Sequence, residues 1–131
     1  MYSRFAVALL AAVTLAAAAC GGVTDPSKNK TETFTGTLTI GGSNVHLFSA
    51  SNSGEYSVTV KSLTPSANVF LYTAFGQVLS GNCSIVQQNI ASTVGFESLN
   101  GAIVPGSYCV QIADQGGLTQ TETYVLEVSH P

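Results

Sequence analysis

The stretch EYSVTVKSL, residues 55–63, decides the fold class because apolar and polar side chains alternate along it. Successive side chains of a β-strand point to opposite faces, so a period of two indicates a strand with one face in the core. We therefore expect Tyr56, Val58 and Val60 to face inward, and the residues between them to face water.

Segments of the same kind recur along the chain, separated by runs of Gly, Pro, Ser and Asn that are typical of turns. We expect no helix after the N-terminal segment. Short strands at this spacing are typical of a sandwich or barrel, and we predict an all-β, jelly-roll-like antiparallel β-sandwich of about eight strands. Besides residues 55–63, the expected strands are 33–40, 44–50, 68–73, 84–90, 93–99, 105–114 and 121–129, with a turn at Phe75–Gly76.

The composition limits the classes of partner. The chain has 131 residues, enough for one domain, and only 8% of them are charged. Four Lys and Arg residues stand against seven Asp and Glu residues, for a formal net charge of −3. Such a chain has no basic patch for a phosphate backbone, so we expect no nucleic-acid partner.

The N-terminal segment resembles an export signal. Arg4 precedes an apolar run that begins at Phe5 and ends in small residues, so residues 1–19 are predicted to be a secretory signal peptide. The run is shorter than the ~20 residues that a membrane-spanning helix needs. The sequence AAAC, residues 17–20, resembles a bacterial lipobox, although Ala17 stands where Leu is usual.

That resemblance implies that Cys20 becomes the lipidated first residue of the mature protein and anchors it to a membrane. The alternative is an ordinary signal peptide cut after Ala19, which leaves Cys20 as a stray thiol. Gly21 after the cysteine suggests sorting to the outer membrane if the cell has two membranes. Residues 20–31 are then the lipidated cysteine and a flexible tether, and residues 32–131 are the domain.

Three cysteines leave one odd thiol in an exported chain. If Cys20 is lipidated, Cys83 and Cys109 remain as a pair, and a disulfide between them is expected in an oxidising compartment. It would close a loop of about 27 residues and contribute roughly 3.5 kcal/mol in the chain-entropy model. A redox-active pair is the alternative, but the spacing is not C-x-x-C.

Nothing in the sequence has the pattern of a catalytic or metal site, so we expect no enzymatic activity, no cofactor and no bound metal. His46 and His130 are the only histidines, and both are expected on the surface. No G-x-S-x-G segment accompanies a serine. Asp114 opens a DQGG turn, where Asp favours local backbone hydrogen bonds. Glu residues are expected at solvated strand edges; they are Glu55, Glu97, Glu122 and Glu127.

The order of the strand motifs resembles the bacterial pre-peptidase C-terminal domain across residues 33–128. The positions that fit its pattern are Gly36, Phe48, Gly54, Leu71, Gly76, Gly106, Tyr108 and Tyr124. The resemblance implies a β-sandwich that is a non-catalytic appendage of secreted proteases and other hydrolases. The chain departs from the pattern at Ala67–Asn68, where the family often has Asp, which weakens the case for a cation bound there.

Together these observations predict a non-enzymatic, lipid-anchored cell-envelope protein whose sandwich is a surface interaction or structural module. Its partners would be the membrane, through the anchor, and a cell-surface protein or polysaccharide. A carbohydrate-binding module is one alternative, with Phe70 and Tyr72 as ligand-contact aromatics because they share one side of a strand. A calcium-dependent binding module and an accessory domain for a separate secreted protease are the others.

Overall fold

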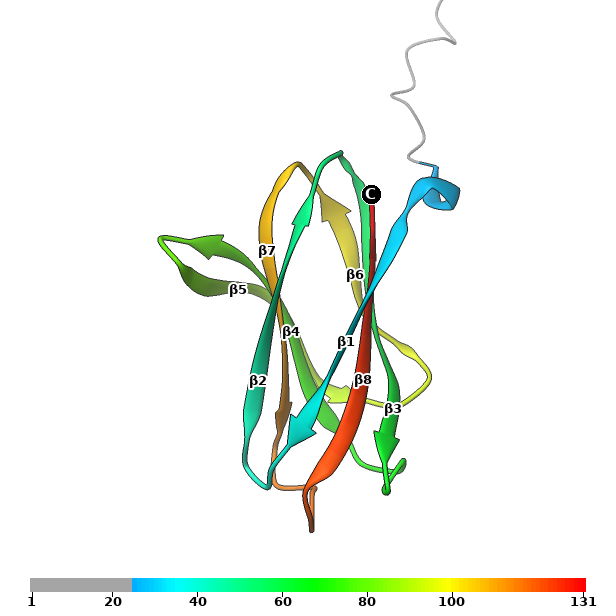
Figure 1. The fold of residues 1–131 in the computed structure, drawn as a ribbon, viewed down its shortest axis with the longest axis vertical. Helices are drawn as coiled ribbons and strands as arrows, with labels where there is room; N and C mark the ends of the chain where they lie inside the picture. Colours follow the sequence, from blue (N-terminus) through cyan, green and yellow to red (C-terminus); the bar gives the residue numbers. More distant parts are fainter. Residues whose placement is uncertain (1–24) are drawn as a thin grey trace, which may run out of the picture.

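The computed structural model describes residues 25–131, so the predicted signal peptide and Cys20 lie outside the described residues. Eight antiparallel strands follow a short 3₁₀ turn at Pro26–Lys28 (Figure 1). The strands are β1 (Lys30–Leu38), β2 (Ser43–Ala50), β3 (Gly54–Thr64), β4 (Leu71–Leu79), β5 (Asn82–Ser92), β6 (Glu97–Ile103), β7 (Gly106–Asp114) and β8 (Glu122–His130).

The strands form two four-stranded sheets, in the orders β1-β8-β3-β6 and β2-β7-β4-β5. Every pairing is antiparallel, and the first strand pairs with the last. This is the strand order of a double-sheet jelly roll, which hides most of its edges by facing two sheets together. The predicted all-β, jelly-roll-like sandwich is therefore confirmed.

The core lies between the sheets and follows the alternation of the sequence. Tyr56, Val58 and Val60 of β3 are buried, as predicted. β8 buries alternate residues in the same way, and β7 does so except that Cys109 is buried as well. A bulge in β3 after Val60 then shifts the alternation, so that Leu63 also faces the core. Tyr56 stacks on Phe75 of the opposite sheet, with ring centroids 3.8 Å apart.

Several element boundaries differ from the prediction. β1 begins at Lys30, so the last two residues of the expected tether belong to a strand. β6 begins at Glu97 rather than at residue 93. The largest difference is in β4, which continues through Phe75–Gly76, where the sequence predicts a turn and the structure has an irregularity in the pairing with β5. The chain turns instead at Ser80 and Gly81, which both have positive φ.

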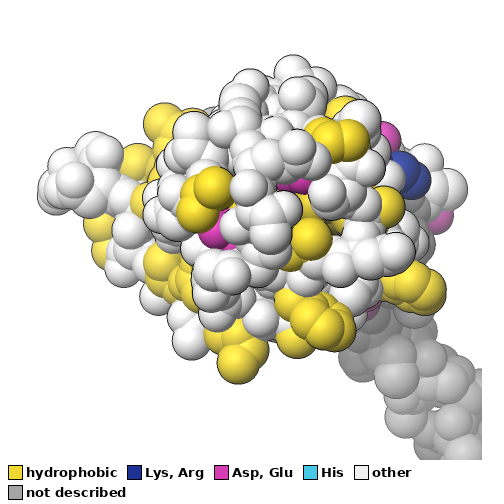
Figure 2. Space-filling model, turned by 90° about the horizontal axis from the view of Figure 1, so that it is seen from below, with side chains coloured by type: hydrophobic (Ala, Val, Ile, Leu, Met, Phe, Trp, Pro, Cys, Tyr) yellow, Lys and Arg dark blue, Asp and Glu magenta, His cyan; other side chains and the backbone are white. Residues whose placement is uncertain are grey.

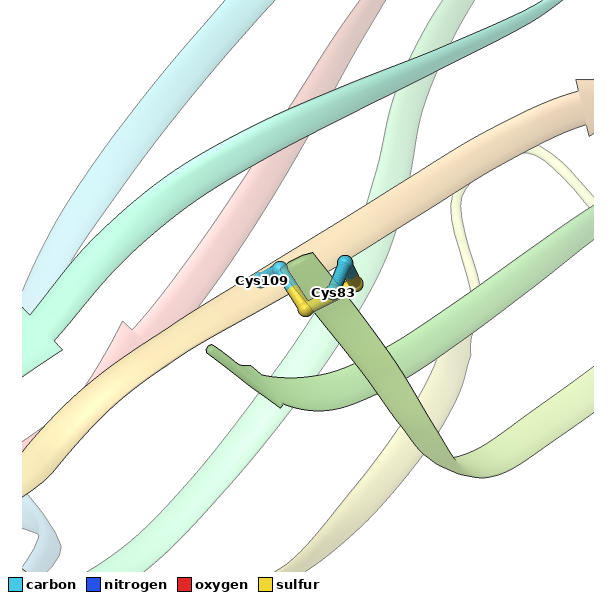
Figure 3. Close-up of a disulfide and its surroundings, with 2 residues drawn as sticks. All are labelled: Cys83 and Cys109. Atoms are coloured by element: carbon cyan, nitrogen blue, oxygen red, sulfur yellow. A yellow bond between two sulfur atoms is a disulfide. The ribbon is translucent and has the colours of Figure 1, made fainter. Parts of the chain in front are cut away.

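Gly76 allows β5 to fold closely over β4. A Cβ atom at Gly76 would lie 2.3 Å from the Ser84 carbonyl oxygen, which leaves no room for any side chain. The predicted disulfide between Cys83 of β5 and Cys109 of β7 is confirmed, with Cα atoms 5.8 Å apart (Figure 3). These two strands are not neighbours, because β4 lies between them, so the bridge passes over β4 at Gly76. Cys109 alternates with the core residues Tyr108 and Val110 and so faces outward, yet it is fully buried beneath this crossing.

The N- and C-terminal ends of the sandwich meet, because Lys30 of β1 pairs with His130 of β8. The antiparallel order places four loops at the opposite end, in the lower part of Figure 1. We call this the loop end; it consists of residues 39–42, 65–70, 93–96 and 115–121. A nine-residue strand spans about 30 Å, which separates the loop end from the point where the chain enters.

Candidate functional site

The two sheets differ in charge. Asp, Glu, Lys and Arg side chains occur on all four strands of the β1-β8-β3-β6 sheet: Lys30, Glu32, Glu55, Lys61, Glu97, Glu122 and Glu127. In the β2-β7-β4-β5 sheet only Asp114 is charged, and it is 8% exposed. The outer face of that sheet, which we call the uncharged face, therefore presents no formally charged side chain to solvent.

Among the strands, the exposed large apolar side chains are found on the sheet that lacks exposed charges. None of the exposed large apolar residues of the described chain lies on a strand of the β1-β8-β3-β6 sheet. The β2-β7-β4-β5 sheet carries Val45, Leu47, Leu79, Ile85, Val86 and Ile90. A surface that is both uncharged and partly apolar is cheaper to desolvate than a charged one, so this side of the sandwich is the better contact surface.

The loop end adds further apolar groups to the same surface. Phe70 and Phe96 are 65% and 71% exposed, and Ile90 of β5 is 64% exposed. Viewed from below, this end shows yellow hydrophobic side chains at several places on its surface, with carboxylates visible only in small areas (Figure 2). Exposed apolar surface rimmed by polar residues commonly marks a binding site.

Two shallow hollows flank Phe70. The first, of about 310 Å³, is lined by residues 67–70 together with Thr93, Val94 and Phe96. The second, of about 400 Å³, is lined by residues 68–70 together with Ile90 and residues 115–117. Neither hollow has a charged residue in its lining. Asn68 borders both hollows, and Gln115 borders the second.

The structure exposes the two predicted ligand-contact aromatics, Phe70 and Tyr72, to different extents. Phe70 is exposed at the loop end, but Tyr72 is half-buried on β4, and its hydroxyl donates to Gln88 Oε1 at 3.1 Å. Tyr72 borders neither hollow, and Phe96 takes its place beside Phe70. Sequence reasoning misses Phe96 because the pattern of residues 93–99 predicts a strand there, whereas β6 begins at Glu97. The preceding Gly95, which has positive φ, was the signal for a turn.

Asp114 fixes two of the four loops at this end. Its Oδ1 accepts hydrogen bonds from the backbone N–H groups of residues 116, 117 and 118, and its Oδ2 accepts one from Gly41. Burial alone would raise the pKa of Asp114, but the four backbone donors outweigh it and hold the pKa below its ordinary value. The local role expected of Asp114 at the DQGG turn is thus present, and it extends to the β1–β2 loop.

Glu122 and Gly95 fix the other two loops. Glu122 is 1% exposed, so the prediction that it lies at a solvated strand edge is wrong. Its Oε2 accepts a hydrogen bond from the Ser66 N–H at 2.9 Å, which holds the β3–β4 loop. Burial opposes its ionisation, but the hydrogen bonds from Ser66 and Gln120 hold its pKa below the ordinary value. The Gly95 N–H donates to the Val60 carbonyl at 2.8 Å, which ties the β5–β6 loop to β3.

The two histidines do not form a reactive site. His46 is half-buried, stacks on Phe34 and lies 2.7 Å from the Tyr124 hydroxyl, and burial lowers its pKa. His130 is fully buried, so its expected surface position is wrong; it packs on Phe48 and contacts Glu32 at 3.0 Å.

No group of three or more His, Cys, Asp or Glu side chains within residues 25–131 is arranged to hold a metal ion. The same residues contain no helix long and apolar enough to cross a membrane.

The sequence matches no protein-family model and no curated protein. Two solved structures have a similar fold. One is a mitogen from Yersinia pseudotuberculosis, with a TM-score of 0.58 and 17% identity over 79% of this chain and 87% of that one. The other is the pre-peptidase C-terminal domain of a collagenase from Bacillus anthracis, with a TM-score of 0.54 and 16% identity over 74% of this chain and 87% of that one. At this identity the likeness concerns the fold, and it supports the predicted resemblance at that level.

Proposed function

We propose that this chain is a non-enzymatic, lipid-anchored protein of the bacterial cell envelope, and that its β-sandwich is an interaction module. The single observation that carries the proposal is the division of charge between the two sheets. The β1-β8-β3-β6 sheet faces water, and the uncharged face with the adjoining loop end contacts the partner. Neither similar structure is described as a catalytic domain, which agrees with a binding role.

The anchor and the contact surface fit one orientation. The chain that leads to the proposed lipidated Cys20 enters the sandwich at β1, at the end opposite the loops. A domain held by that chain directs the loop end away from the membrane, with the uncharged face along its side. The Cys83–Cys109 disulfide suits an exported protein, since such bonds persist in oxidising compartments.

The anchor is tested by fractionating cells that express the full chain or its Cys20→Ser variant. We expect the unchanged protein in the membrane fraction, with an intact mass that starts at Cys20 and includes added acyl groups. The Cys20→Ser protein should leave that fraction. If both proteins are soluble and unmodified, the envelope role is wrong and a secreted role replaces it.

The contact surface is tested by placing a photo-crosslinking amino acid at Leu47 or at Thr33 in intact cells. Both positions are exposed and outward-facing, Leu47 on β2 of the uncharged face and Thr33 on β1 of the charged sheet. We expect adducts from Leu47 and few or none from Thr33. Equal labelling from the two positions, or labelling from Thr33 alone, would contradict the assignment of the contact face.

A further inference from the structure

Phe70 lies between the two hollows of the loop end. It lines both of them, and its ring is 65% exposed. Val69 before it packs against the core and Leu71 after it is fully buried, so the alternation of the chain holds Phe70 outward. An extended ligand that spans both hollows would therefore lie on the Phe70 ring, with one part of the ligand in each hollow.

The chemistry of the lining points to an uncharged ligand that is rich in hydroxyl groups. The two hollows present aromatic and aliphatic surface with the amides of Asn68 and Gln115 and no charged side chain. Aromatic faces bind the C–H surfaces of a ring, and a few amides fix its hydroxyls. The lysines of the described chain, which an acidic polymer would need, lie before β1, on β1 and on β3; they are Lys28, Lys30 and Lys61.

Other occupants fit less well. A stable dimer buries about 800 Å² per partner, which is more than the exposed apolar side chains of this end supply together; they are Ile40, Phe70, Ile90 and Phe96. An extended peptide would add to the free edge of β5, but β5 has register shifts at two places in its pairing with β4, and such bulges turn an edge away from further pairing.

The loop end is also preorganised, because specific bonds already hold its loops. Asp114 fixes the β7–β8 loop to the β1–β2 loop, Glu122 holds the β3–β4 loop and the bond from Gly95 holds the β5–β6 loop. A site whose loops are ordered before binding loses less conformational entropy when the ligand arrives. Nothing in the core of the fold requires Phe70 and Phe96 to be exposed together, which favours a binding role for the pair.

We propose that the loop end binds an uncharged polysaccharide, with one sugar ring on Phe70 and its neighbours in the two flanking hollows. This inference rests on the proposed function, since it names the ligand class of the same surface. Phe96 closes the first hollow. The Asn68 amide would bond sugar hydroxyls, and so would the Gln115 Oε1 atom, whose amide nitrogen already donates to the Ile90 carbonyl at 2.8 Å.

The test measures binding of the purified full chain to a panel of neutral polysaccharides and neutral oligosaccharides, with acidic polysaccharides for comparison. We expect binding to at least one neutral member that changes little between low and high salt. Phe70→Ala should weaken it about tenfold or more, Phe96→Ala should weaken it less, and Phe70→Tyr should retain it because the ring remains. Val104→Ala, which shortens another exposed apolar side chain, between β6 and β7 at the other end, should leave binding unchanged.

Each other outcome overturns the inference. No binding to any neutral member, binding to acidic members that salt abolishes, or binding that Phe70→Ala leaves intact contradicts it. So does concentration-dependent self-association that Phe70→Ala removes in the absence of sugar, because the occupant is then a second copy. Crosslinking from Leu47 is a separate measurement. If sugar binding fails but Leu47 still gives adducts, the polysaccharide inference is wrong and the proposed contact face stands. If Leu47 gives no adducts, the proposed function is contradicted. Because Phe70 is exposed, the variants should melt at the same temperature as the unchanged protein.

Discussion

Replacing Gly76 with alanine is expected to be one of the most damaging single-methyl changes in this protein. The new Cβ would lie 2.3 Å from the Ser84 carbonyl oxygen, 2.7 Å from its carbon and 3.1 Å from Cys109 Sγ. To reach ordinary contact the backbone of β5 must retreat by about 1 Å. It cannot do so freely, because the neighbouring Cys83 is bonded to Cys109.

We expect the free energy of unfolding to fall by about 3 kcal/mol, at the upper end of typical overpacking costs. Urea denaturation measures it. Gly106→Ala is the matched control, because its nearest atom would lie 3.4 Å away and its φ is not positive. That variant should stay within about 1 kcal/mol of the unchanged protein, and can even gain from the lower entropy of the unfolded chain.

A double-mutant cycle tests the cause. In a chain that also carries Cys83→Ala and Cys109→Ala, β5 is free to lift, so Gly76→Ala should cost at least about 1 kcal/mol less than in the disulfide-bonded protein. The reasoning is refuted if Gly76→Ala costs no more than Gly106→Ala, or if its cost is the same with and without the disulfide.

Three further predictions follow from the contacts described above. Removing the disulfide by Cys83→Ala and Cys109→Ala should lower the free energy of unfolding by roughly 3.5 kcal/mol in urea; a loss below about 1 kcal/mol would contradict the chain-entropy estimate. Because the pKa of Asp114 is lowered in the folded state, its contribution is complete above the unfolded value of about 3.9 and is lost as the pH falls through the folded value. Thermal melts between neutral and strongly acidic pH should therefore show a steeper loss for the unchanged protein than for Asp114→Asn, and parallel curves would argue against this role. Tyr124→Phe removes the hydroxyl that pairs with His46 and should cost about 1 kcal/mol in urea, with no change expected if the contact is absent in solution.

The fold was predictable where each strand has one buried and one solvated face. In β3 the alternation of the buried Val58 with Ser57 and Thr59 reports burial directly, so local sequence predicts both the strand and its buried face. Strand β4 was not predictable in this way, because Gly76 marks a close approach of β5 rather than a turn. Sequence alone does not distinguish a glycine required by a positive φ from a glycine required because a neighbouring strand approaches closely.

The site was predictable only in part, because it depends on residues far apart in the chain. The exposure of Phe70 follows from alternation with Val69 and Leu71. The partnership of Phe70 with Phe96 does not, since it requires the β3–β4 and β5–β6 loops to meet at one end of the sandwich. The burial of His130 could not be predicted from local sequence for the same reason. Its partner Glu32 is on the first strand, whereas the histidine is on the last.

The pairing of the first strand with the last has a mechanical consequence. The chain enters at Lys30, and β1 is held to β8 by a continuous register from Lys30 to Leu38. If the proposed tether were pulled while the proposed ligand held the loop end, the force would run along the strands rather than across them. The backbone hydrogen bonds between β1 and β8 then share the load in shear, instead of opening one after another like a zipper. The topology would thus make the domain hardest to pull apart along the line that joins the proposed anchor to the proposed ligand.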